Sequence, residues 1–314
     1  MDMPLRRVAV VGGGLVGLGW TIVFARAGLV VRVFDADAGI RQSASSRLQG
    51  SLADMAQHGL VDDVQAIAAR VVVVDRLVDA VGNADYIQES VFERIDVKHA
   101  VSLEIGAAMR PDAVVGSSSS GIPASGFTHD VPNRTRFLVA HPVNPPHLVP
   151  IVELVPAPWT DPAIVPWLRS AMERFGQVPI VVNREIDGFV LNRLQGALLN
   201  EAWALYDAGI ASAADIDKTV SDGLGFRWSF MGPFETIDLN APGGIADYAK
   251  RLGPLYHGIA QTRTAPEPWS PGLIERIEQE RRQDLPADRL RERAAWRDRR
   301  LMALVAHRRK QPGR

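Results

Sequence analysis

The chain has 314 residues, of which 46% are hydrophobic and 23% charged, as is usual for a soluble globular protein with one large domain or two. Its formal net charge of −1 provides no overall field that would attract nucleic acid or a membrane surface. Because cysteine is absent, disulfides, thiol nucleophiles and thiolate metal sites are excluded; this fits a reducing cytoplasm, where we expect the protein to act.

The stretch between Arg7 and Arg26 carries no charge, which raises the alternatives of a membrane span or an export signal. Five glycines interrupt this stretch, namely Gly12, Gly13, Gly14, Gly17 and Gly19. No cleavage-site pattern follows, and the chain continues directly into another strand-like run. We therefore expect neither a span nor a signal.

Short β-branched runs alternate with helical patterns up to about residue 182. The expected strands are 8–11, 30–34, 70–74, 85–87, 113–116, 136–140, 149–155 and 178–182. The main expected helices end at Ala27 or cover 38–69, 97–109 and 163–175. Such alternation predicts an α/β fold: a Rossmann-like, doubly wound, mostly parallel sheet covered on both faces.

The pattern becomes almost entirely helical after about Asn183, which places a boundary between an α/β domain (1–184) and a C-terminal all-helical domain (185–314). Asp187 is expected to cap a helix that runs to Ala208 and ends at Gly209. Its apolar stripe comprises Val190, Leu194, Ala197, Leu198, Ala202 and Leu205. The tail beyond about Pro266 is rich in arginine. Interleaved acidic residues favour a solvated helix or a frayed end over a nucleic-acid-binding arm.

A glycine pattern follows the first strand. Gly12, Gly14 and Gly17 match G-x-G-x-x-G between a strand and a helix, where the glycines permit a tight turn, close approach of a pyrophosphate and close helix packing. Asp35 ends the second strand, where a carboxylate can accept both ribose hydroxyls and repel a 2′-phosphate. An ordinary turn and a surface carboxylate are the alternatives. The joint spacing favours an NAD site.

A histidine and a carboxylate lie twelve residues apart in the second half of the α/β domain. His141 directly follows an expected strand, and Glu153 lies inside the apolar run 151–155. A histidine within reach would stabilise a buried carboxylate, and the pair could work as a general base and its orienting group. The alternative, that Glu153 faces solvent on an edge strand while His141 only packs, stays open. Ser117–Ser120 follow another strand as substrate-positioning hydroxyls or as a polar loop.

Four segments carry a resemblance to a known family: residues 10–17, HPVNPPHLVPIVE (141–153), IDGFVLNRL (186–194) and SDGLGFRWSFMGP (221–233). The chain resembles the 3-hydroxyacyl-CoA dehydrogenase superfamily over roughly residues 5–260. Within that superfamily it is most similar to the branch that contains lambda-crystallin and L-gulonate 3-dehydrogenase. The resemblance implies an NAD-dependent dehydrogenase that oxidises a 3-hydroxyl group.

The resemblance implies four catalytic positions. His141 would be the general base and Glu153 its partner. Ser120 and Asn192 would hold the substrate hydroxyl or carbonyl. From the residues alone, Asn192 is a polar residue on a helix, and only the motif singles it out.

The resemblance also implies cofactor contacts and a partner. Leu15 and Val16 would lie over the phosphates, and Glu93 and Lys98 would contact the cofactor. From the residues alone, Glu93 and Lys98 read as an exposed helical pair. The family further implies a homodimer formed through the helical domain. No metal ion and no nucleic acid are expected.

The basic residues bear on the substrate. Coenzyme A carries several phosphates, and related CoA enzymes present lysines on the helical segment after the second strand. Here residues 38–69 contain no lysine, only Arg41 and Arg47, which argues against a CoA thioester. Arg227 offers a bidentate anchor for a carboxylate, with an internal ion pair as the alternative. The favoured substrate is a small free 3-hydroxy acid such as L-gulonate.

Three other functions stay open. An L-3-hydroxyacyl-CoA substrate is the first. Carnitine is the second, because Trp228 and Phe230 could face a quaternary ammonium, unless they are plain core residues. A non-enzymatic role, either crystallin-like and structural or NAD-sensing, is the third. The presence of His141 and Glu153 argues against it.

Overall fold

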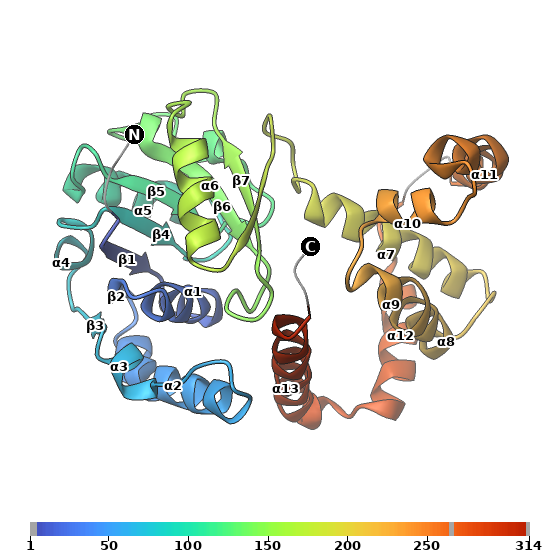
Figure 1. The fold of residues 1–314 in the computed structure, drawn as a ribbon, viewed down its shortest axis with the longest axis horizontal. Helices are drawn as coiled ribbons and strands as arrows, with labels where there is room; N and C mark the ends of the chain where they lie inside the picture. The colour runs from blue at the N-terminus through green and yellow to red at the C-terminus, as the bar shows by residue number, and fades with distance from the viewer. Residues whose placement is uncertain (1–4, 264–266, 312–314) are drawn as a thin grey trace. The chain divides into compact units, whose positions relative to one another are not determined.

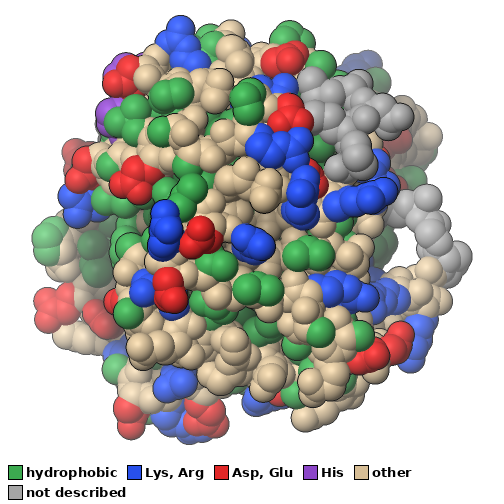
Figure 2. Space-filling view, turned by 90° about the vertical axis from the view of Figure 1, so that its left-hand side faces the viewer, with side chains coloured by type: hydrophobic (Ala, Val, Ile, Leu, Met, Phe, Trp, Pro, Cys, Tyr) green, Lys and Arg blue, Asp and Glu red, His purple; other side chains and the backbone are tan. Residues whose placement is uncertain are grey.

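The computed structural model describes residues 5–263 and 267–311. The chain forms two compact units (Figure 1): Met1–Gln195 together with Ala294–Arg314, and Gly196–Arg293. The first unit contains the sheet and the second contains helices only. On the face shown in Figure 2, basic and acidic side chains are interspersed with hydrophobic ones. None of the described helices is both long and apolar enough to span a membrane.

Eight strands form one sheet in the order β3-β2-β1-β4-β5-β6-β7-β8. They are β1 (Arg7–Val11), β2 (Val30–Phe34), β3 (Val71–Val73), β4 (Tyr86–Glu89), β5 (Val114–Ser117), β6 (Phe137–Pro142), β7 (Ile151–Pro156) and β8 (Val178–Val181). Every neighbouring pair is parallel except β6 and β7, which are antiparallel. The predicted mostly parallel sheet is confirmed.

Helices cover both faces of the sheet (Figure 1). One apolar cluster joins the sheet to α1 (Leu15–Arg26), α2 (Ala38–Gln57), α3 (Val64–Ala68) and α6 (Ile164–Arg174). A second cluster on the other face joins it to α4 (Leu77–Val81) and α5 (Ile95–Ala108). Short 3₁₀ turns η1 (Ala124–Gly126) and η2 (Arg134–Arg136) lie between β5 and β6. Burial on both faces explains why the strands read as continuous apolar runs.

The strand order places the ligand-binding edge. The chain moves from β1 outward to β2 and β3, then returns to add β4 and β5 on the other side of β1. In open α/β sheets ligands bind at the carboxyl ends of the strands, at the point where the order reverses. The glycine loop after β1, the serine run after β5 and His141 near the end of β6 share this edge.

Two expected helices differ from those in the structure. The predicted helix 38–69 is divided into α2 and α3, with Gly59 between them at φ +66°. The helix expected from Asp187 begins instead at Leu191, as α7 (Leu191–Asp207), so Asp187 is not its cap. Gly188 and Phe189, at φ +73° and +49°, are in the left-handed region and cannot continue a helix.

The described part of the second unit consists of three longer helices, α7, α11 (Gly244–Gln261) and α12 (Pro271–Asp284), and several short ones. It contains most of α7, then α8 (Ala213–Lys218), a π-helical turn η3 (Thr219–Leu224), α9 (Gly225–Trp228), α10 (Pro233–Leu239), α11 and α12. The predicted end of α7 at Gly209 agrees with its left-handed φ of +65°. The apolar stripe of α7 is not buried within a single chain; Leu194 is 63% exposed.

The C-terminal tail is helical. After η4 (Ala287–Arg289), α13 (Leu290–Arg309) belongs to the first unit, where Met302 joins the core cluster and Leu301 and Val305 pack against it. The Arg309 guanidinium also donates a hydrogen bond to the carbonyl of Leu60 at 3.0 Å. The expected solvated helix is found, since Met302 is the one buried residue of α13, although this side chain also anchors the helix. A short apolar stripe among many arginines docks it on the α/β unit.

Candidate active site

The glycine loop leaves space where a pyrophosphate would bind. Gly12 has φ +101°, and a Cβ atom on Gly17 would lie 1.8 Å from the carbonyl oxygen of Gly12. A Cβ atom on Gly14 would meet nothing within 4 Å. Gly14 is the N-cap of α1, so the free N–H groups of that helix end face the loop. The loop thus has the shape and the hydrogen-bond donors that a dinucleotide needs. Leu15 and Val16 follow it at the start of α1, and Leu15 is exposed.

Asp35 closes the loop from the end of β2. Its Oδ2 accepts a hydrogen bond from the N–H of Gly13 at 2.6 Å, and its Oδ1 accepts one from Asp37 at 2.8 Å. Each carboxylate oxygen retains acceptor capacity for a ribose hydroxyl. Arg41 reaches the same strand end, but its guanidinium donates to the carbonyls of Asp35 and Ala36 and pairs with Asp75. This arrangement fits NAD better than NADP.

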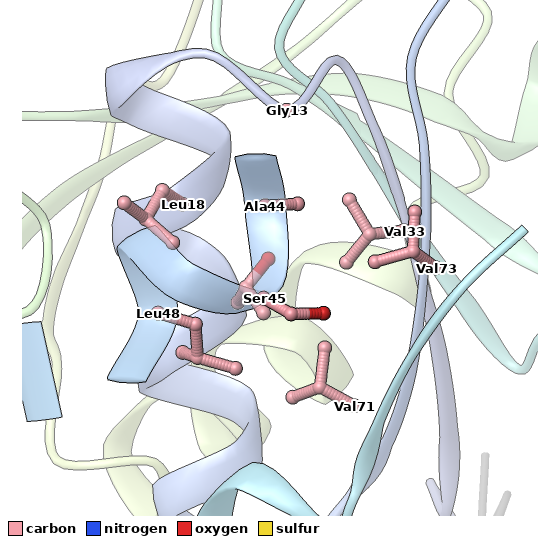
Figure 3. Close-up of a pocket in the computed structure, with 9 residues that line it drawn as sticks. Gly13, Leu18, Val33, Ala44, Ser45, Leu48, Val71 and Val73 are labelled. Atoms are coloured by element: carbon pink, nitrogen blue, oxygen red, sulfur yellow. The ribbon is translucent and has the colours of Figure 1, made fainter. Parts of the chain in front are cut away.

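A small apolar pocket lies under the glycine loop, between α1, α2 and the strands β2 and β3 (Figure 3). Leu18, Ala44, Leu48, Val33, Val71 and Val73 line it, with Gly13 at its edge. Its volume of about 10 Å³ admits no more than a water-sized group. The adenine ring is therefore expected outside this pocket.

His141 and Glu153 form a buried pair. His141 Nδ1 lies 2.7 Å from Glu153 Oε2, and Glu153 is 0% exposed. Glu153 Oε1 accepts hydrogen bonds from the N–H groups of Val190 and Leu191, each at 2.9 Å. Burial would raise the pKa of Glu153, but the bonds from His141, Leu191 and Val190 outweigh it and lower that pKa. The alternative of a solvent-facing Glu153 is wrong.

The ionised carboxylate determines the form of the histidine. A carboxylate can only accept, so Nδ1 of His141 carries the proton and Nε2 holds the free lone pair. Within the described part of the chain, Nε2 has no hydrogen-bond partner. The phenyl ring of Phe189 lies 5.8 Å from the imidazole, centre to centre. His141 is thus oriented with Nε2 as the nitrogen available to a ligand.

Three of the four consecutive serine hydroxyls are used inside the protein. Ser117 donates to Glu89, Ser118 lies among Trp20, Gln88 and Ser90, and Ser119 donates to Glu93 and to the carbonyl of Ile122. Ser120 uses only its backbone: its N–H donates to Glu93 and its carbonyl accepts from Asn192 Nδ2. Among the four, and over the described residues, Ser120 alone has a hydroxyl without a protein partner.

Glu93 and Lys98 do form an ion pair, with Glu93 37% exposed and Lys98 buried, so the interpretation of an exposed pair drawn from the residues alone is wrong for Lys98. Lys98 is fully buried, and its Nζ lies 3.1 Å from Glu89 Oε1 and 3.5 Å from Glu93 Oε2. Glu93 Oε1 accepts from Ser119, Ser120 and Gly121. Burial would raise the pKa of Glu93, but Lys98 and these donors lower it. Lys98 therefore holds the carboxylate that shapes the serine loop.

Glu89 was not anticipated from the sequence. It ends β4, is almost fully buried, and receives Lys98, Ser117 and the N–H of Val91. Its signal was a carboxylate two residues past the expected strand 85–87; in the sheet it lies level with Phe34, one residue before the position of Asp35.

A continuous set of contacts joins the predicted site residues of the first unit. It runs from His141 through Glu153 to the first turn of α7, where Asn192 contacts Ser120, and on through Glu93 to Lys98. Arg227 lies apart from this set, on α9 of the second unit, where it is exposed. It forms no ion pair with another described residue, so the alternative of an internal pair is not supported.

The doubly wound sheet, the dinucleotide loop and the oriented histidine on the same sheet edge define an NAD-dependent dehydrogenase that acts on CH–OH groups. Residues 7–186 match the family model described as 3-hydroxyacyl-CoA dehydrogenase, NAD binding domain, and residues 188–283 match the one for the 3-hydroxyacyl-CoA dehydrogenase, C-terminal domain. The chain belongs to the 3-hydroxyacyl-CoA dehydrogenase family.

Named relatives agree with this family. Lambda-crystallin from Oryctolagus cuniculus is 36% identical, over 93% of this chain and 92% of the relative. L-carnitine dehydrogenase from Streptomyces coelicolor is 34% identical, over 84% and 82%. A solved structure of 5-formyl-3-hydroxy-2-methylpyridine 4-carboxylic acid 5-dehydrogenase, an NAD⁺-dependent dismutase, aligns with a TM-score of 0.83 and 26% identity, over 98% of each chain.

Proposed function

We propose that this protein oxidises the 3-hydroxyl group of a small free 3-hydroxy acid, of the L-gulonate kind, to the 3-keto acid. The observation that carries the proposal is the buried His141–Glu153 pair, which leaves Nε2 of the histidine as a base. The unpartnered hydroxyl of Ser120 supports it, since a donor there can hold the substrate oxygen.

The residues would act as follows. Nε2 of His141 takes the proton of the C3 hydroxyl as the C3–O bond becomes a carbonyl. Glu153 stabilises the imidazolium that results. Ser120 and Asn192 orient the substrate oxygen. The glycine loop and Asp35 would hold NAD, which would supply the acceptor for the hydride from C3.

The state of two arginines supports a small acid over a CoA thioester. Residues 38–69 contain two arginines, Arg41 and Arg47, and no lysine. Arg41 is held by backbone carbonyls and Asp75, and Arg47 donates to the carbonyl of Gly13 at 2.9 Å. Neither guanidinium is part of a cluster of free positive charges that would bind the phosphates of CoA. Arg227, exposed and unpaired among the described residues, is proposed as the carboxylate anchor.

Carnitine is the second candidate. A relative of this chain is named L-carnitine dehydrogenase. Trp228 and Phe230 are 39% and 54% exposed instead of packed in a core, and the face of Trp228 could hold a cation. An aromatic face against the trimethylammonium group would replace Arg227 as the main determinant of specificity.

The test follows NADH absorbance with L-gulonate, a short L-3-hydroxyacyl-CoA and carnitine in parallel, for the wild type and His141→Gln. Turnover of L-gulonate that falls about 10²–10⁴-fold in His141→Gln would support both substrate and base. Arg227→Ala should raise KM for L-gulonate only. Arg251→Ala, an exposed control on the same unit, should leave that KM unchanged. Preferred turnover of the CoA thioester would reject L-gulonate as the kind of substrate and would still agree with membership of the family.

We also propose that the helical unit forms a homodimer. It exposes large apolar side chains in a single chain, including Ile210, Phe226, Phe234, Leu239 and Leu255. Exposed apolar surface of this kind marks an interaction site in a soluble protein. Light scattering after gel filtration would test this, and a monomeric mass at micromolar concentration would reject it.

A further inference from the structure

Two histidines and an aspartate converge on the outer side of α5, away from the residues assigned to catalysis. His99 lies in the second turn of α5, and His129 and Asp130 lie in the loop between η1 and η2. Asp130 Oδ1 is 2.7 Å from His99 Nε2 and 3.7 Å from His129 Nε2. One ligand atom from each residue lies within 4.8 Å of the other two. Such a grouping across 31 positions is brought about by the fold, not by a local motif.

The loop that carries His129 and Asp130 is anchored on both sides. Phe127 is buried, and its ring lies 6.0 Å from Lys98 Nζ. Thr128 is buried, and both its N–H and its hydroxyl donate to the carbonyl of Ala124. Val131, directly after Asp130, is also buried, and its N–H donates to the carbonyl of Thr128. The backbone on either side of the two ligands is therefore held before any ion binds, which lowers the entropic cost of assembling a site.

The side chains are also arranged as ligands. The imidazole rings of His99 and His129 are stacked, with centroids 5.3 Å apart and planes 7° from parallel, so both Nε2 atoms face the same carboxylate oxygen. Arg134, four positions after Asp130, is turned to the backbone carbonyl of His129 and the face of Trp159.

We propose that His99, His129 and Asp130 form a site for a divalent transition-metal ion of the Zn²⁺ type. Two imidazoles and one carboxylate suit zinc and its neighbours, whereas Ca²⁺ and Mg²⁺ require mostly oxygen ligands. Ligand bonds of about 2.0–2.2 Å need only a small widening of the His99–Asp130 contact. The side chains are 30%, 62% and 52% exposed, so an ion can enter and keep water in its remaining positions.

The bound ion would tie α5 to the η1–η2 loop. His99 is adjacent to Lys98, but the two side chains point to different surroundings, one half-exposed and one fully buried. The site is thus separate from the dehydrogenase chemistry, and the proposal does not depend on the identity of the substrate. Its expected effect is added thermal stability in the presence of Zn²⁺, because a ligand that binds only the folded state stabilises it.

The test uses the full-length, tag-free, chelator-treated protein titrated with ZnCl₂ in a calorimeter, with Co²⁺ absorption as an optical readout of coordination. One ion per chain is expected, together with a higher Tm. His99→Ala, His129→Ala and Asp130→Asn should each weaken binding at least about tenfold, since each removes a ligand. His257→Ala, an exposed histidine on α11, is the matched control and should bind as the wild type does.

Other outcomes would overturn the proposal. Absence of Zn²⁺ uptake by the wild type would do so directly and needs no variant. Uptake that persists in the His99→Ala/His129→Ala double variant, or that NAD⁺ displaces, would place the ion elsewhere. Circular dichroism and NAD⁺ binding of each variant separate loss of a ligand from loss of folding.

Discussion

His141 and Glu153 are direct cross-strand partners in the only antiparallel pair of the sheet, β6 and β7. Opposite positions in such a pair carry side chains on the same face, within reach of each other. Because β7 runs antiparallel to β6, two residues only twelve positions apart in sequence lie opposite each other. A parallel neighbouring strand would not place them so. The base and its orienting carboxylate are held by sheet register, not by loops.

The first prediction concerns that pair. Glu153→Gln should lower kcat by about 10²-fold or more while NAD⁺ affinity stays near the wild-type value, because the imidazolium loses its negative partner. Steady-state kinetics and an NAD⁺ titration would measure both. Glu173→Gln, on the exposed face of α6, is the control and should leave kcat unchanged. Wild-type kcat in Glu153→Gln would remove the pair from the mechanism.

A second prediction separates two glycines of the cofactor loop. Gly14→Ala should leave stability nearly unchanged but weaken NAD⁺ binding, because its Cβ meets no protein atom and would occupy the place of the cofactor. Gly17→Ala should reduce stability as well, because its Cβ would lie 1.8 Å from the carbonyl oxygen of Gly12. Thermal unfolding with and without NAD⁺ distinguishes the two. Equal loss of stability in both variants would contradict the assignment.

The buried lysine leads to a third prediction. Lys98→Met should cost about 3–5 kcal/mol of unfolding free energy, since it leaves the carboxylates of Glu89 and Glu93 without their cation. Lys218→Met is the matched control: its pair with Asp215 is 69% and 64% exposed, so its loss should change stability far less. Urea denaturation gives both values. The double variant Lys98→Met/Glu89→Gln should regain part of the stability that Lys98→Met loses. Similar costs for Lys98→Met and Lys218→Met would refute the network.

The sheet and the cofactor loop could be predicted because their signals are local. Each strand is a β-branched run bounded by turns, and the glycine spacing follows directly from the needs of a pyrophosphate. The His141–Glu153 pair was within reach for the same reason, since a carboxylate in an apolar run needs a partner. What the pattern left open was which face Glu153 occupies, and the reversal of β7 decides it.

Tertiary contacts explain the failures. Lys98 reads from the sequence as a solvated helical lysine, but it is buried against Glu89 at the end of β4, a contact that joins two separate elements. α7 begins at Leu191, later than expected, and Glu153 on strand β7 accepts hydrogen bonds from the N–H groups of Val190 and Leu191 at that end. Both effects depend on residues far away in sequence, which propensities and periodicity do not register.

The docked tail gives a fourth prediction. Met302→Ala should cost about 2–5 kcal/mol because this side chain is 4% exposed and joins the main core cluster. Leu304→Ala, two positions along α13 and 42% exposed, should cost less than about 1 kcal/mol. Chemical denaturation would compare the two. Equally small effects of the two substitutions on stability would mean that α13 does not dock on the α/β unit. Deletion of the tail should then leave folding intact.

The last prediction is a pH dependence at the base of α13. His147 lies in the loop after β6 and lines a pocket with residues of α13, and its Nδ1 has no partner among the described residues. Burial, and then the charge of Arg26, lower its pKa from 6.5 to about 4, against the opposing effect of Asp298. The folded protein therefore keeps His147 neutral in an interval where the unfolded chain binds a proton.

The sign follows from that difference. As the pH falls from 6.5 toward 4, the unfolded state gains a proton that the folded state does not, so stability decreases across this window and levels off below it. At about 1.36 kcal/mol per pKa unit the full effect is roughly 3 kcal/mol. His147→Gln should flatten the decline measured by denaturation between pH 7 and 4, whereas His58→Gln, on the exposed end of α2, should not. An unchanged slope in His147→Gln would show that acid instability in this range arises from other groups.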